Sequence, residues 1–252
     1  MLVIENVTVR FGGVTALSDF SAQVPDGEIC GFIGPNGAGK TTLFNCCTRV
    51  VQPTAGRISF DGQDLLAKPI RGVIRCGVAR TFQNLAIFPT LTVLDNTMVG
   101  AQSRARVSFA QGVVGWPPSV RRQRRLRAEA YEILEQVGLA DVAFERADSL
   151  PFGTQKRLEL ARALAARPRL LLLDEPAGGL THAEVAELGQ LIQRVCADFK
   201  LSAVLVEHHM GLVMSISDRV VALNFGRKIA EGTPAEVRQH PELIQAYLGT
   251  AA

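Results

Sequence analysis

The chain has 252 residues, of which 47% are hydrophobic and 20% are charged, and its net charge is +3. This length accommodates one α/β domain with an inserted or appended subdomain and a sizeable core, and so small a net charge does not by itself indicate a nucleic-acid binder. Because no apolar run approaches the roughly 18 residues that span a bilayer, any membrane role is expected to be that of a peripheral subunit.

The first part of the chain has short strand patterns separated by turns. The segments "LVIENVTVRF", "ALSDFSAQV" and "EICGFI" predict strands, with Asp26-Gly27 as a turn between the second and the third. A helix is predicted from Thr41 through "TLFNCCTRV", and "TAGRISFDGQDL" predicts a further turn and strand.

The middle of the chain, from about Val93 to Leu164, has a mainly helical pattern. The segment "RAEAYEILEQVGL" places Tyr131, Leu134 and Val137 on one helix face, and Gly138 is a typical helix end. Buried-strand runs return in "RLLLLDEP" and "SAVLVEHH", and "DRVVALNFGRKIAEG" predicts a closing pair of strands. The predicted fold class is therefore α/β, with a core from residues 1–90 and 165–252 and a helical insertion at about 91–164.

Five cysteines are spread along the chain without a CxxC pair. An odd count in a chain of this size is typical of reduced cytosolic thiols, and a zinc site is not expected. The residues are Cys30, Cys46, Cys47, Cys76 and Cys196.

The stretch "GPNGAGKTT" fits the phosphate-binding pattern G-x-x-x-x-G-K-[ST] between a predicted strand and a predicted helix. Glycines let the backbone curl so that successive N–H groups converge on phosphates, and the following helix adds its N-terminal partial charge. Lys40 can reach the β- and γ-phosphates, and the Thr41 hydroxyl can bind Mg²⁺. The alternative is a glycine-rich turn that happens to contain a lysine. The expected nucleotide-binding residues are Gly34, Pro35, Asn36, Gly37, Ala38, Gly39, Lys40, Thr41 and Thr42.

Two carboxylates follow the buried run "RLLLL" at the expected carboxyl end of a strand, where open α/β sheets bind ligands. Asp174 is expected to hold Mg²⁺ through water, and Glu175 to polarise the attacking water. A plain surface turn is the alternative, and the upstream phosphate loop makes the catalytic interpretation the stronger one. Gln83 and His208 also stand at strand ends, although such residues on their own are more often structural.

Five segments in this order resemble the nucleotide-binding subunits of ABC transporters: "GPNGAGKTT", "RTFQN", "LPFGTQKRLELARAL", "LLLLDEP" and "VEHHM". The resemblance covers essentially the whole chain. It implies a P-loop NTPase core, a RecA-like parallel sheet with an antiparallel β subdomain, and an inserted helical subdomain. It also implies ATP and Mg²⁺ as ligands.

The resemblance implies roles for single residues. Gln83 matches the glutamine that couples Mg²⁺ and water to the membrane partner, and so is also a metal candidate. His208 matches the histidine beside the γ-phosphate. Phe11 occupies the place of the aromatic residue that stacks on adenine, with a plain core residue as the alternative.

The signature segment departs from the family pattern. In "LPFGT", Pro151 and Thr154 replace the usual Ser and Gln, so the serine contact to the phosphate of the opposite subunit is not expected. Gly153 is retained, and a helix is predicted to start near Gln155 and point its N-terminus at that site. In "GGLT", Thr181 replaces an aspartate that makes an ionic contact across the family's dimer.

The segments "ARTFQN", "VEHHMGLVMSISDRVVALNFGRKIAEGTP" and "PELIQAYLG" resemble the ATPases of branched-chain amino acid importers. This implies a second ATPase subunit, of the same or a related chain, together with transmembrane permease subunits and, indirectly, an extracytoplasmic substrate-binding protein. It further implies a peripheral location at the cytoplasmic face of the cell membrane and no nucleic-acid partner.

Several alternatives stay open. They are an ATPase for another importer or for lipid or lipopolysaccharide export, a non-transport ABC ATPase, and a non-hydrolysing nucleotide-binding regulator. Glu175 argues against the last, because a pure binder needs no base.

The run "SVRRQRRLRAEA" carries five arginines between Arg121 and Arg127. Its helical spacing favours a solvated helix face, with proximity to anionic lipid next. No aromatic residues are interleaved, which weakens a nucleic-acid interpretation.

Overall fold

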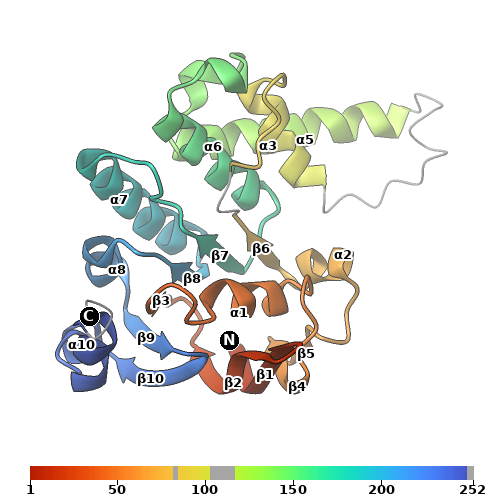
Figure 1. Cartoon of the computed structure of the whole chain (residues 1–252). Helices are drawn as coiled ribbons and strands as arrows, with labels where there is room; N and C mark the ends of the chain where they lie inside the picture. The colour runs from red at the N-terminus through yellow and green to blue at the C-terminus, as the bar shows by residue number, and fades with distance from the viewer. Residues whose placement is uncertain (82–84, 103–116, 249–252) are drawn as a thin grey trace. The chain divides into compact units, whose positions relative to one another are not determined.

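The computed structural model describes residues 1–81, 85–102 and 117–248, with side chains in the last range described for residues 121–247. The chain divides into two compact units (Figure 1). The first comprises Met1–Gln83 and Arg169–Ala252, and the second comprises Asn84–Pro168. The predicted helical insertion at about 91–164 falls inside the second unit.

The first unit contains a six-stranded sheet in the order β10-β9-β3-β8-β7-β6. Neighbouring strands from β9 to β6 run parallel, and only the edge pair β9–β10 is antiparallel. Every residue of β3, β7 and β8 is buried, as expected of parallel strands covered on both faces. The strands are β3 Ile29–Ile33, β6 Val78–Arg80, β7 Leu170–Asp174, β8 Ser202–Val206, β9 Arg219–Asn224 and β10 Arg227–Gly232.

A second, antiparallel sheet of the same unit has the strand order β2-β1-β4-β5. Its long strands carry the partly alternating burial of a sheet with one face toward a core. Together the two sheets confirm the predicted fold class, a parallel core sheet with an antiparallel β subdomain. The strands are β1 Leu2–Phe11, β2 Val14–Val24, β4 Ala55–Phe60 and β5 Gln63–Asp64.

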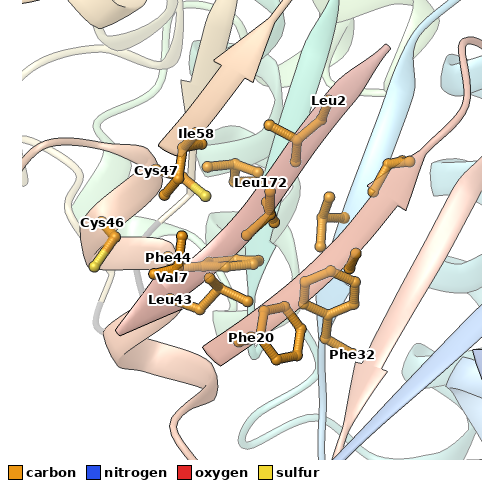
Figure 2. Close-up of a cluster of buried hydrophobic side chains, with 14 of the residues drawn as sticks. Leu2, Val7, Phe20, Phe32, Leu43, Phe44, Cys46, Cys47, Ile58 and Leu172 are labelled. Carbon is orange, nitrogen blue, oxygen red and sulfur yellow. The ribbon is translucent and has the colours of Figure 1, made fainter. Parts of the chain in front are cut away.

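Helix α1, Lys40–Cys47, shares one hydrophobic core with both sheets. Figure 2 shows Leu43 and Phe44 of this helix among side chains from the antiparallel sheet, such as Phe20, and from the parallel sheet, such as Phe32. The helix begins at the end of the predicted phosphate loop, and apolar side chains of both sheets pack against it. It ends three residues earlier than predicted, because Arg49 takes a left-handed φ of 64° and turns the chain.

The other helices of the first unit include α7 and α8, which approach each other closely. A Cβ on Gly189 of α7 would lie 2.7 Å from a Leu212 side-chain atom of α8, so a larger residue here would force the Leu212 side chain to move. Helix α7 begins with a capping box in which Thr181 and Glu184 bond each other's backbone N–H groups. The helices are α2 Ile70–Val73, α7 His182–Phe199, α8 Met210–Ile216, α9 Pro234–Arg238 and α10 Pro241–Leu248, with a 3₁₀ turn at Ile74–Cys76.

The second unit is helical in its described residues and packs three longer helices on one another. Leu134 and Val137 are buried as their predicted helix face requires, and Tyr131 is partly buried. Gly138 follows α5 with a φ of 73°, which fits its predicted place at the helix end. The elements are α3 Val93–Gln102, α5 Pro117–Gln136 and α6 Phe152–Ala165, with 3₁₀ turns at Ala140–Val142 and Ala147–Ser149.

The basic run lies on α5. Four of its five arginines are exposed, which agrees with the predicted solvated face, and Arg122 is partly buried. Arg125 pairs with Glu129 at 2.9 Å one turn along the helix, and the guanidinium of Arg127 lies 5.8 Å from the centre of the Phe144 ring.

All five cysteines lie in described residues, and all are buried without a disulfide. Burial raises the pKa of Cys46 to about 11 and the pKa values of Cys47 and Cys196 to about 12. It raises the pKa of Cys30 as well. The sulfurs are thus packed as small hydrophobic groups.

Among the described residues, no helix combines the length and apolar character that a bilayer crossing requires.

Candidate functional site

The predicted phosphate loop connects the buried strand β3 to the first residue of α1. Two of its glycines have backbone conformations and surroundings that exclude a side chain. A Cβ on Gly34, whose φ is 152°, would lie 2.2 Å from the Leu223 carbonyl oxygen. A Cβ on Gly39, whose φ is 103°, would lie 2.6 Å from the Ala16 carbonyl oxygen. The loop is therefore fixed against β9 on one side and β2 on the other.

The N-terminus of α1 has no side-chain cap, because its N-cap residue is Gly39. The first amides of a helix have no acceptor within the helix, and they attract anions together with the helix dipole. This end of α1 opens into a cavity of about 170 Å³. The residues around the cavity come from the loop, from β2 and from the ends of two strands of the parallel sheet. They are Ala16, Asn36, Gly37, Ala38, Gly39, Lys40, Thr41, Thr42, Glu175 and His208.

Lys40 folds back over its own loop. Its Nζ donates hydrogen bonds to the carbonyl oxygens of Gly34, at 2.6 Å, and Pro35, at 2.9 Å. Burial lowers the pKa of Lys40, and the negative charge of Glu175 acts in the opposite direction. Two carbonyls thus hold the Lys40 ammonium at the cavity, near the Glu175 carboxylate. From this position the ammonium can bind the oxygens of an incoming polyphosphate.

Glu175 and His208 meet at the carboxyl ends of β7 and β8. His208 Nε2 lies 2.7 Å from Glu175 Oε1, within hydrogen-bond distance. The Glu175 side chain is largely buried, whereas the His208 side chain is 46% exposed. Glu175 itself has a left-handed φ of 49°, which is uncommon for a residue other than glycine.

Asp174, which precedes Glu175 in the sequence, is buried and forms an ion pair that we did not predict. Its Oδ2 accepts a hydrogen bond from Arg80 at 2.5 Å, and Arg80 also donates to Asn45 Oδ1 of α1 at 2.8 Å. The second carboxylate oxygen, Oδ1, is buried and has no hydrogen-bond partner among the described residues. An unsatisfied buried carboxylate oxygen fits a bound cation or its water shell.

Phe11 is 51% exposed at the end of β1, so the alternative of a plain core residue disagrees with the structure. An exposed ring is available for stacking. Gln83 lies outside the described residues, and its predicted role stays a prediction.

The signature segment belongs to the second unit. Gly153 lies in the first turn of α6, which begins at Phe152 with Pro151 as its N-cap residue. The prediction of a helix start near Gln155 was therefore wrong by three residues. Pro151 has a φ of −55° and a ψ of 150°, and Gln155 N–H donates to its carbonyl, so the proline fits just outside the helix.

Three residues near the cavity were not predicted. Arg80 holds Asp174. Glu207 is a buried carboxylate between β8 and His208. Tyr247 of α10 hydrogen-bonds the backbone of Gly34, a contact that opposes the rise in the pKa of Tyr247 caused by its burial. Of these, only Glu207 had a sequence signal, namely a charge directly after a buried apolar run.

Comparison with known proteins shows the family of the chain. Residues 17–178 match the family model described as ABC transporter. Residues 227–252 match one described as branched-chain amino acid ATP-binding cassette transporter. The high-affinity branched-chain amino acid transport ATP-binding protein BraF of Pseudomonas aeruginosa is 41% identical over 251 residues, which is 100% of this chain and 98% of that protein. LivG of Escherichia coli K12, which carries the same description, is 39% identical with the same coverage.

Solved structures show the same fold. The ADP conformation of MJ1267, an ATP-binding cassette of an ABC transporter, superposes with a TM-score of 0.86 at 28% identity, covering 99% of this chain and 98% of that one. The dimeric structure of MJ0796, a bacterial ABC transporter cassette, gives 0.77 at 25% identity, covering 93% and 99%. Because the family model matches more than half of this chain, the chain belongs to the ABC transporter family and is one of the ATP-binding, ATP-hydrolysing cassettes of that family.

Proposed function

We propose that this chain hydrolyses ATP at the cavity beside α1 to drive uptake of branched-chain amino acids or closely related solutes. The observation that carries the proposal is the convergence of Lys40, Glu175 and His208 on one cavity built from a glycine-fixed phosphate loop. Phosphoryl transfer to water needs a cation that binds the phosphate and a base that accepts the proton of the water. A histidine that orients the base supports this chemistry.

The protein contacts both the phosphates and the adenine of the nucleotide. The stretch Gly34–Thr42 presents backbone N–H groups and the α1 N-terminus to the phosphates, and Lys40 exchanges its carbonyl partners for phosphate oxygens. The exposed ring of Phe11 stacks on the adenine.

Mg²⁺ would be held by the Thr41 hydroxyl and, through water, by Asp174 Oδ1, with Gln83 as a further ligand expected from the sequence. When bound, the ion neutralises charge that develops on the β- and γ-phosphate oxygens. Arg80 fixes the other oxygen of Asp174 and leaves Oδ1 as the one available for the ion.

Hydrolysis is an in-line attack of water on the γ-phosphorus. Glu175 accepts the proton of the water as its oxygen bonds to phosphorus, and the bond from phosphorus to the ADP oxygen breaks. His208 holds the Glu175 carboxylate through Nε2. The products are ADP and inorganic phosphate, and the proton on Glu175 passes to solvent.

A second ATPase subunit, the same chain or a related one, completes each site with its signature segment, in which Gly153 lets the backbone approach the γ-phosphate. Dimer formation by the MJ0796 cassette supports this partner. The pair acts on transmembrane permease subunits at the cytoplasmic face of the membrane, and a substrate-binding protein delivers the solute from outside. ATP drives the cycle to the extent that it binds the closed dimer more tightly than the open one.

Replacing Phe11 with Ala is expected to weaken ATP binding about tenfold, since stacking on a base contributes on the order of 1–3 kcal/mol. Affinity for tripolyphosphate, which has no base, should stay unchanged. Competition titrations with both ligands measure this, with Phe144→Ala in the helical unit as a control for loss of an exposed ring. Equal losses for ATP and tripolyphosphate contradict the stacking role.

The transported solute is tested by uptake of radiolabelled leucine into cells that lack this chain. Wild type and Glu242→Gln, an exposed carboxylate changed in the same way, should restore uptake, and Glu175→Gln should not. Unlabelled isoleucine and valine should compete with leucine. Unchanged leucine uptake in the deletion strain, together with loss of uptake of another solute, would refute the solute assignment and leave the ATPase assignment intact.

A further inference from the structure

Glu207 is a charged side chain enclosed by backbone. It is only 3% exposed and follows β8 directly. Its Oε1 accepts a hydrogen bond from the Ala177 N–H at 2.7 Å. Its Oε2 accepts hydrogen bonds from the N–H groups of His208, at 2.8 Å, and His209, at 3.1 Å. One carboxylate thus binds three backbone amides.

These three amides belong to the two loops that carry the proposed catalytic pair. Ala177 is two residues beyond Glu175 in the loop after β7, and His208 begins the loop after β8. The strands β7 and β8 are neighbours in the sheet, so the two loops leave it side by side. The two oxygens of Glu207 therefore connect the loop that follows Glu175 to the loop that begins at His208.

Both members of the pair need such support. Glu175 holds a left-handed φ of 49°, which a residue other than glycine keeps only where its surroundings enforce it. Around that turn, Glu175 N–H donates to the Val206 carbonyl at 2.8 Å and Gly178 N–H donates to the Glu175 carbonyl at 3.2 Å. His208 has little packing of its own, because nearly half of its side chain is exposed.

We propose that Glu207 is a positioning residue for ATP hydrolysis, whose carboxylate fixes the distance between Glu175 and His208 by holding both of their loops. The inference rests on the proposed roles of that pair. Glu207 contacts backbone and not substrate. Only a carboxylate offers acceptors at both ends, since a glutamine would turn an NH₂ group toward one of the two sets of N–H donors.

The test is Glu207→Gln in the purified full chain. The turnover number for ATP should fall by about 10- to 100-fold, the size of effect that small misplacements of catalytic groups produce. Nucleotide affinity and KM should stay within about twofold, because the phosphate loop is not altered. Glu207→Asp keeps the charge and both acceptors but has a shorter reach, so it should lose less than Gln. Asp218→Asn is the matched control, because it removes another carboxylate that accepts a backbone N–H, from Ile29 at the opposite end of β3.

A double mutant separates positioning from general damage. In a Glu175→Gln background, adding Glu207→Gln should cause little further loss, because the group being positioned is already gone. A full multiplicative loss, a wild-type rate in Glu207→Gln, or a change confined to KM each overturns the inference.

Hydrogen exchange on the wild-type chain gives a second test that needs no variant to fold. The amides of Ala177 and His208 should exchange slowly, as bonded and buried N–H groups do. Exchange at the rate of an open loop overturns the inference as well. If wild type does not hydrolyse ATP, or Glu175→Gln is as fast as wild type, it is the proposed function that fails, whatever Glu207 does.

Discussion

Replacing Glu175 with Gln is expected to slow ATP hydrolysis by about 10²- to 10⁴-fold while leaving ATP binding intact. The amide has almost the same size as the carboxylate but cannot accept a proton from water. An amide can still hydrogen-bond His208 Nε2, so the geometry at the end of β7 should persist. Phosphate release by the purified chain measures the rate, and titration with a fluorescent ATP analogue measures the binding.

Glu242→Gln, an exposed glutamate in α10, is the control for the loss of one negative charge. A wild-type rate in Glu175→Gln would place the base elsewhere, and His208 is then the next residue to change. Size-exclusion chromatography with and without Mg-ATP adds a second measurement. A variant that binds but does not cleave ATP should accumulate as an ATP-dependent dimer, whereas a variant that stays monomeric indicates that a different subunit completes the site.

Replacing Lys40 with Ala is expected to weaken ATP binding by about 100-fold or more. Hydrogen bonds to charged groups contribute roughly 1.5–3 kcal/mol each, and every 1.4 kcal/mol is a factor of ten in affinity. Among the described residues that line the cavity, Lys40 is the one with an ammonium group, and its Nζ donates hydrogen bonds to Gly34 and Pro35. The change to Ala removes this group. Because Gly34 and Gly39 are also fixed by their close approach to the backbone of Leu223 and Ala16, the folded chain should persist.

Two further variants make the Lys40 measurement specific. Lys228→Ala removes a lysine that pairs with Glu231 on β10, outside the cavity, and should bind ATP like wild type. Lys40→Arg keeps the charge but brings a larger, planar group into a site where the ammonium is buried, and should restore little of the affinity. Unchanged affinity in Lys40→Ala would reject the phosphate-binding assignment of this loop.

Much of the fold follows from the sequence because its signals are local. The apolar runs of β3, β7 and β8 are buried throughout, as their composition indicated. The spacing of Gly34, Gly39 and Lys40 predicted the phosphate loop. The structure explains the two glycines, because neighbouring backbone atoms leave no room for a Cβ at either position.

Helix ends were predicted less well, because local signals there conflict. The pattern after Lys40 continues to Val50, yet Arg49 takes a left-handed conformation and the helix stops at Cys47. For α6, the helix was predicted to start near Gln155. The structure places Gly153 inside the first turn, since Pro151 already provides the extended residue that precedes a helix.

Side-chain partners far apart in sequence could not be predicted. Arg80 and Asp174 are 94 residues apart and meet because β6 and β7 pair in the sheet. Glu207 reaches Ala177 across 30 residues for the same kind of reason, through the pairing of β7 with β8. A periodic pattern reports which face of a strand is buried, but not which side chain lies opposite on the next strand.

The burial of all five native cysteines makes the chain suitable for site-specific labelling without first removing its thiols. Thiol reagents attack the thiolate, and burial holds the pKa values of Cys46, Cys47 and Cys196 far above neutral pH. A cysteine introduced at an exposed position should therefore react first. One fluorescent label on the exposed face of α5 and one on α10 would then make the distance between the two units observable by energy transfer as nucleotide binds, in a chain otherwise unchanged.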